Sequence, residues 1–79
     1  MDRYTLTYEG RARFRRMATR LHADTASVTK NYEVLNHLYE HGAATVEEIE
    51  GYTGISWNEL INRLSALMYY GYIEELEER

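Results

Sequence analysis

The chain has 79 residues, enough for one small domain, and a domain of this size buries only about 60% of its unfolded surface, so its core is expected to be marginal for a monomer. It has no cysteine, which excludes a disulfide framework. It also has neither a signal-like N-terminal segment nor the roughly 20 apolar residues of a membrane span, so we expect a soluble, cytoplasmic protein. The net charge of -4 is uneven, with six arginines in residues 1–22 and eleven acids in residues 23–79, and this asymmetry suggests charged partners without identifying them.

The first half of the chain predicts a strand and two helices. Residues 4–8, Tyr-Thr-Leu-Thr-Tyr, alternate in the manner of a half-buried strand. A basic helix is expected over residues 9–22, with Thr7 as its N-cap. A second helix is expected over residues 26–41 and ends at Gly42.

The second half predicts two helices separated by a glycine-containing turn. Thr45 and Glu48 have the spacing of a capping box, which begins a helix over residues 45–53. Ser56 and Glu59 repeat that spacing and begin a helix over residues 56–70, whose apolar positions recur at three- and four-residue steps: Leu60, Leu64, Leu67 and Met68. Gly71 ends this helix, and residues 72–76 are expected to form a strand. We therefore expect one mainly α domain with a small β-sheet over residues 1–79.

The order helix, turn, helix, glycine and strand resembles winged helix-turn-helix regulators of the MarR and PadR type. The resemblance rests on the turn Gly54-Ile55-Ser56 and on the ending Leu67 to Gly71-Tyr72-Ile73. With Leu35 and Leu38 of the preceding helix, it runs from Tyr32 to Leu76. It implies a winged-helix fold, although winged helices serve several functions besides reading DNA.

The N-terminal segment departs from that pattern in its position. Residues 4–11, Tyr-Thr-Leu-Thr-Tyr-Glu-Gly-Arg, are similar to the returning wing strand of PadR-like proteins and the helix start after it, which there follow the C-terminal strand. We hypothesise that this strand pairs with residues 72–76, either within one chain or across a dimer. The alternative is a chance likeness at an arginine-rich helix start.

The resemblance implies that the helix over residues 56–70 enters the major groove of DNA. Asn58 and Asn62 lie one turn apart and suit adenine edges, Arg63 suits guanine or phosphate, and the candidate residues at the helix start are Ser56 and Trp57. Trp57 either belongs to this contact surface or, as we favour, folds back into the core. Because this helix has one arginine and several acids nearby, we expect help from the first helix, with phosphate contacts from Arg11, Arg15 and Arg16. The alternative is that these arginines pair with acids or are simply solvated.

The sequence thus predicts a small regulator of transcription that binds double-stranded DNA as a homodimer. The alternative is a winged-helix adaptor or inhibitor, encoded by a virus or mobile element, that binds a larger protein through its acidic or aromatic surface. His22, His37 and His41 suggest a metal site only weakly, because a solvated helix face explains the pair His37 and His41. We find no pattern typical of catalysis and expect no enzyme activity, cofactor or metal.

Overall fold

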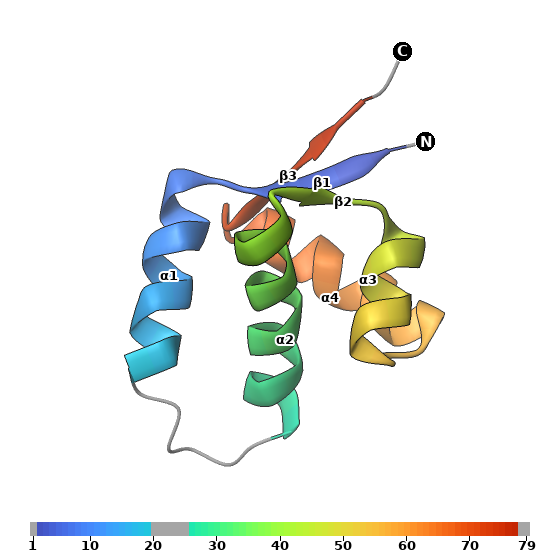
Figure 1. The fold of residues 1–79 in the computed structure, drawn as a ribbon, viewed down its shortest axis with the longest axis horizontal. Coiled ribbons are helices and arrows are strands. Elements are labelled where there is room, and N and C mark those ends of the chain that lie inside the picture. The colour runs from blue at the N-terminus through green and yellow to red at the C-terminus, as the bar shows by residue number, and fades with distance from the viewer. Residues whose placement is uncertain (1, 20–25, 78–79) are drawn as a thin grey trace.

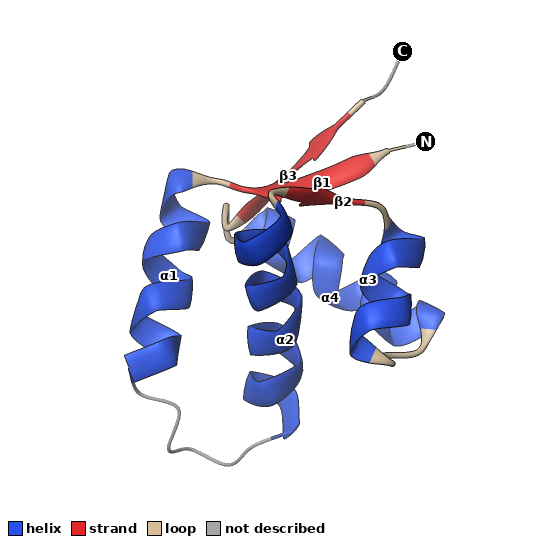
Figure 2. Cartoon of the chain, in the orientation of Figure 1, coloured by secondary structure: helices blue, strands red, loops and turns tan. Residues whose placement is uncertain are grey.

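The computed structural model describes residues 2–19 and 26–77 of the chain. This part of the molecule contains four helices and a three-stranded antiparallel sheet (Figure 1; Figure 2). In chain order the elements are β1 (Arg3–Leu6), α1 (Tyr8–Thr19), α2 (Ala26–His41), β2 (Ala43–Ala44), α3 (Val46–Thr53), α4 (Trp57–Tyr69) and β3 (Ile73–Leu76). The expectation of a mainly helical protein with a small sheet is therefore confirmed.

The N-terminal strand β1 is the central strand of the sheet, whose order is β2-β1-β3. Tyr4 lies opposite Ala44 of β2 and Glu75 of β3, and both pairings are antiparallel. The predicted pairing of the N-terminal strand with the C-terminal strand is confirmed, and it occurs within one chain. Because Arg3 pairs with Leu76, the outer ends of β1 and β3 lie side by side where the sheet projects from the helices (Figure 1).

The junction between β1 and α1 is fastened to the turn between α4 and β3. The Thr7 hydroxyl accepts a hydrogen bond from the Gly10 N–H at 3.0 Å, which confirms Thr7 as the N-cap of α1, and donates one to the Gly71 carbonyl at 2.5 Å. The Thr7 N–H donates to the Tyr72 carbonyl at 3.1 Å. Gly10 approaches this carbonyl so closely that a Cβ at Gly10 would lie 1.8 Å from its oxygen. Residues 7–10, which follow the buried Leu6, therefore hold the start of α1 against the turn between α4 and β3.

The short helix α3 begins at the predicted capping box. The Glu48 N–H donates to the Thr45 hydroxyl at 3.2 Å, and the Thr45 N–H donates to the Glu48 carboxylate at 3.2 Å. The hydrogen bond from the Thr45 N–H to the Glu48 carboxylate, followed by one from the Thr45 hydroxyl at 3.1 Å, lowers the pKa of Glu48. The helix ends at Gly54, whose φ of 73° suits glycine, and the chain turns there into α4.

The second predicted capping box, at Ser56, is wrong. Ser56 occupies the N-cap position of α4, but its side chain makes no capping hydrogen bond. The Glu59 carboxylate that was expected to complete the box instead accepts hydrogen bonds from Lys30 and Arg63. Tertiary contacts therefore prevail over the local pattern, because two cations bind the carboxylate more strongly than one backbone N–H would.

The core lies where α2, α3 and α4 meet beneath the sheet. The largest fully buried side chains come from these three helices: Val34, Leu35, Leu38, Ile49, Leu60 and Leu64. The predicted α4 positions Leu67 and Met68 are buried and half-buried, respectively. Helix α1 adds the buried Phe14, whose ring stacks on Tyr32 and Tyr39 of α2. Within the described residues, no helix has the length and apolar character needed to cross a membrane.

Several predicted boundaries need correction. The strand expected over residues 4–8 ends at Leu6, because Thr7 caps α1 and Tyr8 is the exposed first residue of that helix. The helix expected over residues 9–22 therefore starts one residue earlier, and residues 20–22 lie outside the described part of the chain. The prediction over residues 26–41 is confirmed, and those over 45–53, 56–70 and 72–76 differ only at terminal residues. Strand β2 was not predicted, because two alanines carry no β signal.

Candidate nucleic-acid interface

Helix α4 has one buried and one exposed face. Leu60, Leu64 and Leu67 are buried in the core, whereas Asn58 and Asn62 are exposed. The two asparagines are four residues apart, so their amides project from neighbouring turns of the same face. Ser65 extends this polar face and is also exposed. The arrangement can offer hydrogen-bond donors and acceptors to a partner that lies along the helix.

Arg63, the predicted contact to guanine or phosphate, does not belong to this exposed face. Its guanidinium donates to the Asn31 Oδ1 at 2.9 Å and to the Glu59 carboxylate at 3.0 Å, and its side chain is only 16% exposed. Glu59 also accepts from Lys30 of α2 at 2.8 Å. The hydrogen bonds from Lys30 and Arg63 lower the pKa of Glu59. Arg63 thus links α4 to α2 rather than reaching toward a guanine or phosphate.

The start of α4 is accessible. Ser56 is exposed, and Trp57 is 43% exposed, so the prediction that this tryptophan folds back into the core is wrong. Ile55, two residues earlier in the chain, is buried, whereas Tyr52 is also exposed. A large aromatic side chain left partly in water at a helix start suits a contact surface. Ser56, Trp57, Asn58 and Asn62 therefore form one accessible surface, which we call the α4 face.

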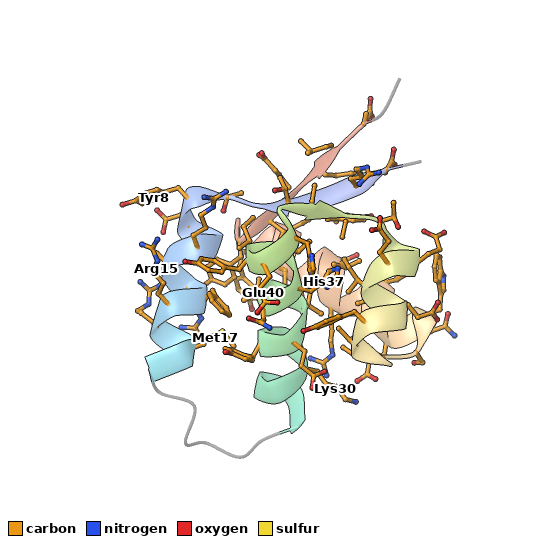
Figure 3. The ribbon with its side chains drawn as sticks, viewed as in Figure 1. Tyr8, Arg15, Met17, Lys30, His37 and Glu40 are labelled. Atoms are coloured by element: carbon orange, nitrogen blue, oxygen red, sulfur yellow. The ribbon has the colours of Figure 1, made fainter. Side chains whose placement is uncertain are left out.

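The arginines of α1 are exposed but stand apart from the α4 face. Arg11, Arg15 and Arg16 are all exposed, and Figure 3 shows Arg15 and Tyr8 on the side of α1 that faces away from α2. Figure 1 shows α1 and the first turn of α4 on opposite sides of α2. The structure therefore brings together the four residues of the α4 face and, separately, the three arginines, without merging the two groups.

Acidic side chains occupy the projecting end of the sheet and the outer side of α3. Glu74 and Glu75 of β3, with Glu77 after it, are exposed, as is Glu47 of α3. Arg3 of β1 lies 3.9 Å from Glu48. A phosphate backbone placed against the sheet end would meet negative charge, which lowers affinity at low salt.

His37 is a buried histidine between α2 and α3 (Figure 3). Its ring lies between His41 and Tyr52, with ring centroids 4.5 Å away in each case. Within the described residues, neither ring nitrogen has a hydrogen-bond partner. Burial first, and the neighbouring His41 second, lower the pKa of His37, while Glu48 and Glu40 act in the opposite direction. His37 is therefore a neutral aromatic core residue near pH 7.

The histidines do not assemble a metal centre in the described part of the chain. No group of three or more histidine, aspartate or glutamate side chains there is arranged to hold a metal ion. His37 and His41 contact each other by their rings. His22, the remaining candidate, lies outside the described residues.

Acid is expected to destabilise the fold through His37. In the unfolded chain its pKa is the ordinary 6.5, whereas in the folded protein its pKa is lower. Below the ordinary value the unfolded chain binds more protons, so the free energy of unfolding falls as the pH drops toward the folded pKa. His37→Phe keeps the ring contacts and removes the proton site. The free energy of unfolding, measured with urea, should therefore fall less between about pH 7 and about pH 5 in this variant than in the unmodified protein. An equal fall in both proteins would contradict the prediction.

No protein-family model, curated protein or solved structure matches this chain. Sequence reasoning missed the role of Asn31 and Lys30, which hold Arg63 and Glu59 in place. These residues lie about thirty positions before their partners, with separations of 29 and 32. No local spacing marks such a pair, since it forms only when α2 and α4 pack together.

Proposed function

We propose that the protein is a winged-helix protein that binds double-stranded DNA, with α3 and α4 as its helix-turn-helix. The order α2, β2, α3, α4, β3 supports this assignment, as does the sheet order β2-β1-β3. In this proposal β1 and β3 form the wing, and β1 supplies the strand that follows the C-terminal strand in MarR- and PadR-type regulators. The chain order of the wing is permuted, while the position of each strand in the sheet is kept.

The α4 face carries the proposal. Asn58 and Asn62 are exposed amides one helical turn apart, and an amide can pair with the N6 and N7 of adenine in the major groove. The opposite side of α4 is anchored by leucines and by the Arg63 network, so the amides project from a fixed helix. A fixed helix reads bases at a lower entropic cost than a mobile one.

Charge determines how this binding would depend on salt. Since the α4 face has no cation among its four residues, phosphate contacts fall to Arg11, Arg15 and Arg16 of α1. A homodimer would present two α4 faces to half-sites about 34 Å apart and would double the number of arginines. We propose a homodimeric transcription regulator whose specificity resides in α4 and whose general affinity resides in α1.

The test begins with selection of duplexes from a random library, followed by anisotropy titrations across a salt series. Asn58→Ala and Asn62→Ala should each weaken binding to the selected duplex by about tenfold, within the 1–3 kcal/mol of a bidentate base contact. Alanine at Arg11, Arg15 and Arg16 together should weaken all duplexes alike and flatten the salt dependence. His41→Gln, at the exposed end of α2, should bind like the unmodified protein. Absence of duplex binding even at low salt would refute the proposal.

The acidic sheet end favours a second candidate, an adaptor that binds a basic protein. Glu74, Glu75 and Glu77 form an exposed acidic run on an edge strand and beyond it. Such a surface suits a cationic partner, and the charges also discourage pairing of this edge with a second copy. Glutamine at these three positions would weaken binding to a basic partner and strengthen binding to duplex DNA, so the two candidates predict opposite changes.

A further inference from the structure

A cleft of about 370 Å³ opens between α1, α2 and the C-terminal end of α4. Leu35 and Leu67 contribute apolar lining, and polar groups come from Arg13, Asn31 and Tyr72. This volume lies near the lower end of the range of about 300–1,000 Å³ found for small-molecule sites. The cleft therefore suits a compact ligand and is separate from the amides of the α4 face.

One side of the cleft is an exposed aromatic stack. Tyr70 is 65% exposed, and its ring stacks on that of Tyr72, with the centroids 6.0 Å apart. The guanidinium of Arg13 lies 6.0 Å from the Tyr72 ring centroid. A planar group can stack on the accessible Tyr70 ring while an attached anion contacts the exposed Arg13.

The polar groups of the cleft are mainly donors. Arg13 only donates, and Asn31 uses its Oδ1 to accept from Arg63, which leaves its NH2 group for a ligand. The described residues that line the cleft include no acid, although the whole chain has 13 acidic residues. An acceptor-rich, anionic ligand with a flat ring fits these donors, whereas a cationic ligand does not.

We propose that this cleft binds a nucleotide unit, with the base stacked on Tyr70 and the phosphate held by Arg13. A free nucleotide and an unpaired nucleotide of a single strand share this chemistry. Base stacking on an exposed aromatic ring beside arginines is a common means of holding single-stranded nucleic acid. The site uses none of the residues of the α4 face. The proposed nucleotide binding can therefore be tested separately from the proposed binding of duplex DNA.

The test uses two probes and two pairs of matched variants. Deoxyadenosine monophosphate is titrated by calorimetry, and a short fluorescein-labelled oligodeoxyadenylate is titrated by anisotropy. Tyr70→Ser and Arg13→Gln should each weaken binding about tenfold, since each removes one principal contact. The controls are Tyr8→Ser and Arg3→Gln, which change the same residue types at positions that do not line the cleft and belong to neither proposed binding surface. Circular dichroism confirms that each variant is folded.

The outcomes distinguish the two sources of the nucleotide. Binding of both probes, or of the oligonucleotide alone, that is weakened at Tyr70 and Arg13 but retained in the controls supports an unpaired nucleotide as the ligand. Binding of the mononucleotide alone with the same sensitivity supports a free nucleotide. Absence of binding by both probes overturns the proposal, as does equal weakening in the controls, which would indicate general charge attraction. Loss of duplex binding on changing Asn58 and Asn62 bears only on the α4 face.

Discussion

Replacing Gly10 by alanine is expected to lower the free energy of unfolding by about 3 kcal/mol or more, the upper end of overpacking effects. The new Cβ would lie 1.8 Å from the Tyr72 carbonyl oxygen, 2.8 Å from its carbon and 3.2 Å from a Leu6 methyl group. Because the carbonyl is backbone, it cannot rotate away as a side chain can. Relief requires α1 to separate from the start of β3, which breaks the hydrogen bonds of Thr7.

Thermal and urea denaturation followed by circular dichroism measures this effect. With a total stability of about 5–15 kcal/mol for ordinary domains, a loss of this size in so small a chain should leave a weak or absent cooperative transition. Gly51→Ala is the matched control, because Gly51 is also helical and a Cβ there would meet nothing within 4 Å. That change should stabilise by about 0.5–1 kcal/mol through helix propensity. A Gly10→Ala protein as stable as the unmodified one would contradict the close contact.

Leu60→Ala is expected to destabilise the fold by about 2–5 kcal/mol. Leu60 is 0% exposed and sits on the side of α4 that packs into the core, so truncation removes apolar contacts and leaves a cavity. The reduction should appear as a lower urea midpoint with an unchanged slope. Leu76→Ala is the control, since that leucine is 41% exposed and should change stability by about 0.5 kcal/mol or less.

The same measurement separates folding from recognition. Asn62 lies on the exposed side of α4, so Asn62→Ala should leave the urea midpoint within about 0.5 kcal/mol of the unmodified protein. Its expected effect is on DNA affinity alone. A large loss of stability on changing Asn62 would mean that the amide supports the fold, and its use in base reading would have to be abandoned.

The charge of the sheet has a consequence for the proposed DNA complex. The projecting ends of β1 and β3 lie side by side, where Arg3 pairs with Leu76. The exposed acids near this end, Glu74 and Glu75, disfavour approach to phosphate. We therefore expect recognition to depend on α4, with the sheet serving mainly to hold α1 and α4 together.

Local patterns were sufficient for much of the fold. The Thr45 capping box and the leucine spacing of α4 were read correctly, because such features involve residues within one or two helical turns. The terminating glycines were also correct, since Gly42 has a φ of 84° and Gly71 a φ of 79°, which other residues adopt reluctantly. Strand β2 escaped detection, because its pairing with β1 depends on where β1 lies rather than on its own two alanines.

By itself the sequence determined the helices, their order and the exposed amides at Asn58 and Asn62, and it suggested the pairing of the N-terminal strand with the C-terminal strand, which the tertiary structure places within one chain. Tertiary structure alone decided the partners of Arg63, which Asn31 of α2 holds, and the exposure of Trp57, which stays partly in water. It also decided the burial of His37 and the cleft beside Tyr70. The physical reason is range: caps and helix periodicity act over a few residues, whereas burial and ion pairing depend on which distant surfaces come into contact.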